Sequence, residues 1–203
     1  AQAVRGTHEV RILDGLKDQI MPGDLANHLR EWPPQVFGIS LFSKDLPLTR
    51  EYLRVIKNLF PSCLTVAGGV HPSSVPDKIF QHLCRDLDYA FAGEAEAGFP
   101  AFLEAWENKN LKPAAIPGLI WQEKGAVKFN PRIFPDNLDN YSCAWDLIPP
   151  DSYPPLPHGA FYQGYPIAPV VITRGCPHHC NFCSVHLTNG ARKRTRSLSH
   201  VLR

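Results

Sequence analysis

Residues 63–69, CLTVAGG, form a short apolar run that ends in two glycines. A continuous apolar run of this length between turn residues is typical of a strand that is buried on both faces of a sheet. The segments QVFGISL at 35–41 and DYAFAG at 88–93 are similar in length and are also bounded by turn residues. The sequence therefore predicts a strand at each of these places, with the strand at 63–69 buried.

Segments of helical character separate these strands. The further elements that we expect are a strand at 8–14 (HEVRILD) and helices at 48–60, 73–83 and 98–108. Ser73 or Ser74 is expected to cap the second of these helices, with Pro76 in its first turn. Short strands that alternate with helices of about ten residues predict an α/β fold, a doubly wound parallel sheet with helices on both faces.

The ends of the predicted strands are the first place to look for a ligand site. Ligands of open parallel sheets bind at the carboxyl ends of the strands. The loops that follow Ser40, Gly69 and Gly93 are therefore expected to share one rim of the sheet.

The composition is that of a globular domain. The chain has 203 residues, of which 44% are hydrophobic and 20% charged, enough for one complete domain and part of another. No apolar run approaches the ~20 residues that a bilayer crossing needs, and the first residues lack the apolar core of a secretion signal. We therefore expect a cytoplasmic protein without a membrane partner.

The chain divides into three parts. Residues 1–116 hold the predicted sheet, and residues 117–169 hold a hairpin that turns at Lys124 and Gly125, followed by a linker rich in proline. Because proline fixes φ and removes a hydrogen-bond donor, the linker is expected to be irregular. Its aromatic side chains are expected to hold it in place: Trp145, Tyr153, Phe161, Tyr162 and Tyr165. Residues 170–203 begin a second domain, whose elements would be a strand at 168–174 and a helix from Ser197.

The net charge of +2 conceals a basic end. The last thirteen residues hold five basic side chains and no acidic one: Arg192, Lys193, Arg194, Arg196 and Arg203. Such a run can bind nucleic acid, but it is more often a solvated helix face, and we expect the latter here. Arg174 is also expected to face solvent.

The most specific motif is RGCPHHCNFC, which places Cys176, Cys180 and Cys183 on one short loop. Thiolates are the ligands that iron-sulfur clusters and zinc select. Three cysteines cannot ligate all four irons of a cubane cluster, so one iron would remain open to another ligand. A structural zinc site completed by His178, His179 or His186 is the alternative.

The spacing of the three cysteines, the strand expected before them and the aromatic Phe182 resemble the radical S-adenosylmethionine superfamily. In that family the open iron of a [4Fe-4S] cluster binds S-adenosylmethionine, and reduction cleaves the sulfonium to give a deoxyadenosyl radical. The resemblance implies that Cys176, Cys180 and Cys183 are the metal ligands and that residues from 170 onward begin a partial (β/α) barrel.

The upstream part resembles the cobalamin-binding domain that precedes many radical S-adenosylmethionine barrels. The matching segments are HEVRILD, FGIS, VAGGVHPS, FAGEAE, PGLIW and RGCP, in the order that the family has them. The resemblance implies a Rossmann-like domain that is incomplete at its start. It also implies that the cofactor contacts are Ser40, Gly68, Gly69, His71, Gly93 and Glu94. Gly68 and Gly69 would let the backbone approach a bulky ligand.

Two of these assignments have a simpler interpretation. His71 could ligate cobalt, but a loop histidine that bonds to the backbone is the interpretation that we favour. Glu94 and Glu96 could contact the cofactor, or they could be charges that the amino end of the following helix stabilises.

Together the resemblances imply an enzyme with three cofactors: cobalamin, a [4Fe-4S] cluster and S-adenosylmethionine. The implied reaction is methyl transfer to an unactivated centre of a small-molecule substrate, with electrons from an external flavodoxin-like or ferredoxin-like donor. Ring closure or rearrangement in the same family, a cobalamin-binding module without catalysis and a structural-zinc protein that binds nucleic acid are the alternatives. No catalytic side chain is assigned, and the chain is expected to be an inactive fragment by itself.

Overall fold

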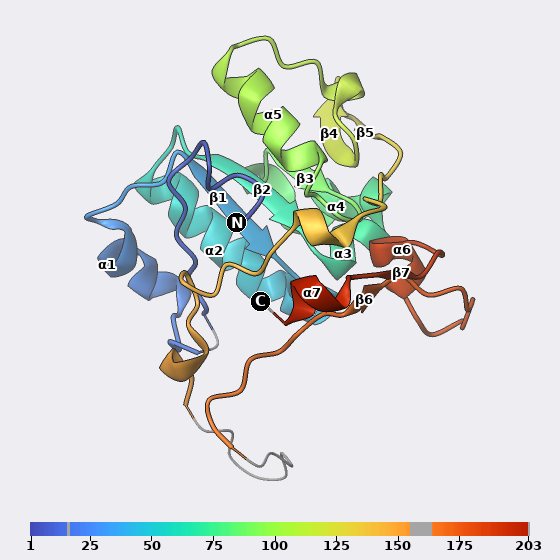
Figure 1. The fold of residues 1–203 in the computed structure, drawn as a ribbon. Coiled ribbons are helices and arrows are strands. Elements are labelled where there is room, and N and C mark those ends of the chain that lie inside the picture. The colour runs from blue at the N-terminus through green and yellow to red at the C-terminus, as the bar shows by residue number, and fades with distance from the viewer. Residues whose placement is uncertain (16, 155–163, 203) are drawn as a thin grey trace.

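The computed structural model describes residues 1–15, 17–154 and 164–202 (Figure 1). Of the aromatic residues expected to hold the linker, Phe161 and Tyr162 lie outside the described residues. No helix in the described part of the chain is long and apolar enough to cross a bilayer.

The core of the fold is a five-stranded sheet whose strands follow one another in chain order. Its strands are β1 (Val36–Ser40), β2 (Leu64–Gly68), β3 (Tyr89–Phe91), β4 (Leu119–Glu123) and β5 (Ala126–Phe129). The first three strands are parallel, and Ser40 at the end of β1 lies opposite Gly68 at the end of β2. The carboxyl ends of these strands therefore form one rim, as the sequence predicts.

Helices cover both faces of the sheet (Figure 1). They are α1 (Leu25–Leu29), α2 (Leu46–Leu59), α3 (Val70–Ser74), α4 (Ile79–Leu83) and α5 (Gly98–Glu107). Because successive residues of a strand point to opposite faces, Ala67 packs with Leu53 of α2 and Phe80 of α4. Its neighbour Val66 packs with Phe102 of α5 on the other face. The predicted doubly wound α/β sheet is confirmed.

The prediction of a strand at residues 8–14 is wrong. These residues form no strand, although their polar and apolar side chains alternate. The segment does not pair with the free edge of β1, and side-chain contacts hold it instead. Glu9 accepts a hydrogen bond from the indole of Trp32 at 2.8 Å, and His8 pairs with Glu107 of α5 at 3.0 Å.

The prediction of one helix at 73–83 is also wrong. The chain forms α3 and α4 with a break at Val75, whose φ and ψ are −135° and 61°. A residue before proline is excluded from the helical region by the proline ring, so Pro76 causes the break. Ser73 and Ser74 consequently lie in the last turn of α3, where neither caps an amino end and their hydroxyls donate to the carbonyls of Gly69 and Val70.

The hairpin that the sequence predicts is present as β4 and β5. Lys124 and Gly125 both have positive φ, of 51° and 81°, as a two-residue hairpin turn requires. The hairpin continues the sheet, however, because β4 pairs antiparallel with β3. The expected division after residue 116 thus separates strands of one sheet, and the domain boundaries themselves remain predictions.

The second region is small. It consists of β6 (Thr173–Arg174), α6 (Val185–Asn189), β7 (Arg194–Thr195) and α7 (Leu198–Val201). The strand expected at 168–174 is reduced to the two residues of β6, because its partner β7 is also only two residues long and antiparallel to it. The helix expected from Ser197 is confirmed as α7, and the Ser197 side chain caps it by accepting the His200 N–H at 3.2 Å.

Candidate functional site

The rim contains the predicted glycines, and the two have different roles. Gly69 has a φ of +97°, and a Cβ there would lie 2.7 Å from the Ser40 hydroxyl oxygen and 2.9 Å from the Leu41 nitrogen. Gly69 therefore allows the loops after β1 and β2 to cross in contact. A Cβ on Gly68 would meet no atom within 4 Å, so the space beside Gly68 is open.

His71 is buried directly behind this rim, with 3% of its surface exposed. Its Nδ1 shares a hydrogen bond with the Ser43 hydroxyl at 2.8 Å, and its Nε2 shares one with Nδ1 of His82 at 2.9 Å. Burial, and then the proximity of His82, lower the pKa of His71 and favour its neutral form. Both ring nitrogens are engaged with protein partners, and these partners are side chains, whereas the loop-histidine interpretation expects backbone.

Gly93 at the end of β3 is covered by the chain that follows the hairpin. A Cβ on Gly93 would lie 3.2 Å from the side chain of Arg132, and the Gly93 N–H donates to the Ser73 hydroxyl at 2.9 Å. Arg132 in turn donates to the Ser73 carbonyl at 2.5 Å. The segment after β5 thus covers the rim at the end of β3, whereas the space beside Gly68 remains open.

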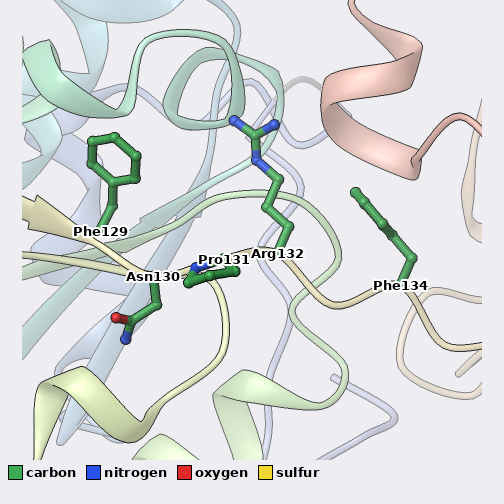
Figure 2. Close-up of a pocket in the computed structure, with 5 residues that line it drawn as sticks. All are labelled: Phe129, Asn130, Pro131, Arg132 and Phe134. Carbon is green, nitrogen blue, oxygen red and sulfur yellow. The ribbon is translucent and has the colours of Figure 1, made fainter.

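A groove of about 410 Å³ lies along the segment after β5, and Figure 2 shows the five residues that line it: Phe129, Asn130, Pro131, Arg132 and Phe134. The side chains of Asn130 and Arg132 point in opposite directions (Figure 2). The Asn130 amide donates to the carbonyls of Pro113 and Ile116, and Arg132 donates to Ser73. The polar side chains that line the groove therefore do not converge on one point, and the groove is not the candidate site.

Glu94 is the most heavily bonded acidic group of the rim. Its side chain is 4% exposed and lies against Arg194 of β7, whose side chain is 3% exposed. The two guanidinium nitrogens of Arg194 donate to the two carboxylate oxygens at 2.7 and 2.9 Å. Asn189, the last residue of α6, donates to the same carboxylate at 3.1 Å. Glu94 thereby joins the end of β3 to the second region.

Arg174 adds a second cation to this cluster. It donates to Glu96 at 2.6 Å and lies 3.4 Å from Glu94. The expectation that Arg174 and the basic end of the chain face solvent is wrong for half-buried Arg174 and for buried Arg194 and Arg196. It is confirmed for Arg192 and Lys193, which are exposed. No feature of the sequence marks Arg174 and Arg194 as the partners of Glu94 and Glu96, because Arg192, Arg196 and Arg203 also follow the cysteine loop.

The cysteine loop lies between these anchors. Cys180 is exposed, whereas Cys176 and Cys183 are half-buried. Gly175 has a φ of +84°, and a Cβ there would lie 2.1 Å from the carbonyl oxygen of Arg192, so only glycine allows the loop to begin this close to β7. The Cys176 N–H then donates to the carbonyl of Gly190 at 3.1 Å. The loop is thus closed at its base.

The donors of this loop fit a metal cluster by their chemistry. Among the described residues, no three His, Cys, Asp or Glu side chains are arranged to hold a metal ion, so the three thiols share a loop without forming a finished site. Metal binding commonly completes such an arrangement. Nδ1 of His186, three residues after Cys183, is buried and has no hydrogen-bond partner in the described part of the chain. A buried polar atom without a partner costs free energy, and a hydrogen bond to a ligand held by the loop would remove that cost.

Comparison with known families identifies the domain that carries the rim. Residues 1–103, half of the chain, match the family described as the B12 binding domain. The chain belongs to the B12-binding domain family. The cobalamin-binding resemblance predicted from the motifs is confirmed at this level.

Curated relatives extend over the B12-binding domain and the cysteine loop. An uncharacterized methyltransferase, PH0819, of Pyrococcus horikoshii is 30% identical over 204 residues, which is all of this chain and 42% of the relative. The hopanoid C-3 methylase of Methylococcus capsulatus is 29% identical over 98% of this chain and 36% of that protein. An anaerobic magnesium-protoporphyrin IX monomethyl ester cyclase of Synechocystis is 24% identical over 87% of this chain and 34% of the relative. The chain thus spans well under half the length of these relatives.

Solved structures share the fold of the B12-binding chain. The cobalamin-dependent S-adenosylmethionine radical enzyme OxsB, with aqua-cobalamin and S-adenosylmethionine bound, matches 98% of this chain and 27% of its own. The TM-score is 0.77 at 20% identity. The methyltransferase TsrM of Kitasatospora setae, with cobalamin and a [4Fe-4S] cluster bound, matches 98% of this chain and 40% of its own. Its TM-score is 0.71 at 18% identity.

The buried carboxylate of Glu94 makes the stability of the fold depend on pH. Burial opposes ionisation of Glu94, but hydrogen bonds from Arg194 and Asn189 and the charges of Arg174 and Arg194 outweigh it. The pKa of Glu94 is therefore lowered from its ordinary value of 4.5. A lowered folded pKa means that ionised Glu94 stabilises the fold in full above the ordinary value. This stabilisation is lost as the pH falls through the folded pKa.

We therefore expect Glu94→Gln to lower the free energy of unfolding by roughly 3 kcal/mol at pH 6, because the substitution leaves Arg194 buried without its counter-charge. The difference from the wild type should shrink as the pH falls below about 4.5. Denaturant unfolding between pH 6 and pH 3 measures it. The control Glu123→Gln removes an exposed ion pair with Lys128 and should cost below about 1 kcal/mol at pH 6. A Glu94→Gln difference that stays constant down to pH 3 would contradict the assignment.

Proposed function

We propose that this chain forms the cobalamin domain and cluster loop of a cobalamin-dependent radical S-adenosylmethionine enzyme that methylates an unactivated centre of a small molecule. The observation that carries the proposal is the attachment of the cysteine loop, through Glu94, to the rim of a B12-binding sheet. An enzyme that uses cobalamin and an iron-sulfur cluster in one reaction needs both sites on the same side of the domain. The activity of the whole protein is part of this proposal.

Support for cobalamin comes from the family match and from the shape of the rim. Gly68 opens space at the end of β2, and Ser40, its partner in the sheet at the end of β1, is exposed. In this proposal Ser40 and Gly68 would help to hold cobalamin. Gly69 acts indirectly, since it keeps the loops after β1 and β2 in contact. His71 supports these loops from behind.

Support for the cluster comes from the donor set. In this proposal Cys176, Cys180 and Cys183 would be the ligands of a [4Fe-4S] cluster, and the iron without a cysteine would be open to S-adenosylmethionine. When bound, the cluster supplies the electron that cleaves S-adenosylmethionine, and cobalamin supplies the methyl group. The chain itself binds and orients these groups, and the exposure of Cys180 leaves the loop accessible to an external flavodoxin-like or ferredoxin-like reductant.

Ring closure is the second candidate reaction, because relatives named as monomethyl ester cyclases match the same part of the chain as the methyltransferases. The nucleic-acid alternative loses two of the basic side chains on which it rests, and only Arg192 and Lys193 of residues 192–196 remain as exposed basic groups. Arg194 and Arg196 are buried and bonded within the protein, so they are not part of an exposed basic patch. A cobalamin-binding module without catalysis would have no use for the cysteine loop.

Reconstitution with iron and sulfide under anaerobic conditions tests the cluster. We expect about four irons per chain and a broad charge-transfer absorption near 400 nm, as thiolate-bound clusters give. Both should be lost when Cys176, Cys180 and Cys183 are replaced together by alanine, whereas Cys143→Ala should retain them. A wild-type chain that binds one zinc and no iron would support the structural-zinc alternative.

Titration with hydroxocobalamin tests the rim. Gly68→Val should weaken binding at least tenfold, because its side chain would enter the open space beside β2, while the melting temperature should change little. A loss of tenfold corresponds to about 1.4 kcal/mol of binding free energy. Gly38→Val is the matched control, since Gly38 lies in β1 and a Cβ there also meets no atom within 4 Å. Equal binding by wild type and Gly68→Val would exclude this place on the rim.

A further inference from the structure

A continuous series of contacts links the Gly68–Gly69 turn to the cysteine loop. The Ser73 hydroxyl donates to the Gly69 carbonyl at 2.7 Å and accepts the Gly93 N–H at 2.9 Å. The next residue, Glu94, holds Arg194 and Asn189. Helix α3, which begins directly after the turn, contacts α6, which follows the cysteines (Figure 1). These contacts therefore fix the position of the cysteine loop relative to the rim of the sheet.

The carboxylate of Glu94 contacts residues on both sides of the cysteine loop. Arg174 lies two residues before Cys176, and Asn189 lies six residues after Cys183. Glu94 lies within 3.4 Å of Arg174 and accepts a hydrogen bond from Asn189 at 3.1 Å. The paired bonds from Arg194 lock its orientation, because a guanidinium and a carboxylate that share two bonds cannot rotate independently.

The electrostatics of the cluster also require this carboxylate. Arg194 is almost fully buried, and a buried guanidinium is costly without a counter-charge. Glu94 and Glu96 balance the charges of Arg174 and Arg194, so the four side chains form a neutral set. If Glu94 lost its charge, the set would carry excess positive charge at the base of the loop.

We propose that Glu94 is a positioning residue that fixes the cysteine loop against the cobalamin rim, and that it does not contact cobalamin itself. This role rests on the proposed function for its purpose, since it sets the geometry between the two cofactor sites. Its physical basis is independent of any cofactor. The donors that surround the Glu94 carboxylate all come from the chain that flanks the loop.

Alkylation of individual cysteines in the metal-free chain tests this role directly. Reaction with iodoacetamide, followed by mass spectrometry, gives a rate for each thiol. In Glu94→Gln we expect Cys176 and Cys183, which are half-buried, to react at least about fivefold faster than in the wild type, because the loop opens locally. The alkylation pulse is kept short enough that global unfolding labels a negligible fraction of either protein, so buried Cys63 should stay unlabelled and exposed Cys143 should stay within about twofold of its wild-type rate. Glu123→Gln, the matched surface control, should change none of the four.

Two results would overturn the proposal. The first is an unchanged rate at Cys176 and Cys183 in Glu94→Gln. The second is labelling of Cys63 in the same short pulse to the same extent as Cys176 and Cys183, which would show that the loop thiols react only through unfolding of the whole domain. If Glu94→Gln does not fold, Asn189→Ala replaces it, since that variant keeps the Glu94–Arg194 pair. It should accelerate Cys183 at least about threefold with Cys63 unchanged, and no acceleration would overturn the proposal.

Iron uptake by the wild-type chain is measured in parallel. It distinguishes a failure of the proposed function from a failure of the proposed role of Glu94. A wild-type chain that takes up no iron contradicts the proposed cluster, while the alkylation rates still decide the role of Glu94. For a chain that does take up iron, we expect Glu94→Gln to lose iron to a chelator several times faster than Glu123→Gln. Equal rates of iron loss would contradict a positioning role.

Discussion

The ion pair between Glu94 and Arg194 is the contact on which the arrangement of the molecule depends. It joins the end of a central parallel strand to a two-stranded region with little core of its own. A charged pair buried to this extent is tolerated only when its hydrogen bonds are satisfied, and here Asn189 and Arg174 complete the set. The cysteine loop therefore takes its position from the B12-binding domain.

Much of the sheet could be predicted from the sequence, because buried parallel strands are continuous apolar runs and CLTVAGG is a clear example. The failures came where tertiary partners decide the outcome. Residues 8–14 alternate like a strand but form none, and the run at 168–174 found only the two residues of β7 to pair with. Local chemistry decided the remaining case, since Pro76 breaks the helix expected at 73–83.

The candidate site could be predicted in part. The rim with Ser40, Gly68 and Gly69 was expected from strand ends, and the sequence placed three cysteines on one loop. What the sequence could not show was which charges meet across a hundred residues. Glu94 and Arg194 are far apart in the chain, and the sequence alone indicates a surface charge for an acid in a turn and for a base in a basic run. Only their burial against each other shows that they join the end of β3 to the second region.

A double-mutant cycle on Glu94 and Arg194 tests this account most directly. Glu94→Gln, Arg194→Met and the double variant are compared with the wild type by denaturant unfolding at pH 7. We expect the two losses to be strongly non-additive, with a coupling free energy of about 2–3 kcal/mol, because each single variant leaves a buried charge without its partner. Losses that add to within about 0.5 kcal/mol would show that the pair does not hold the two regions together.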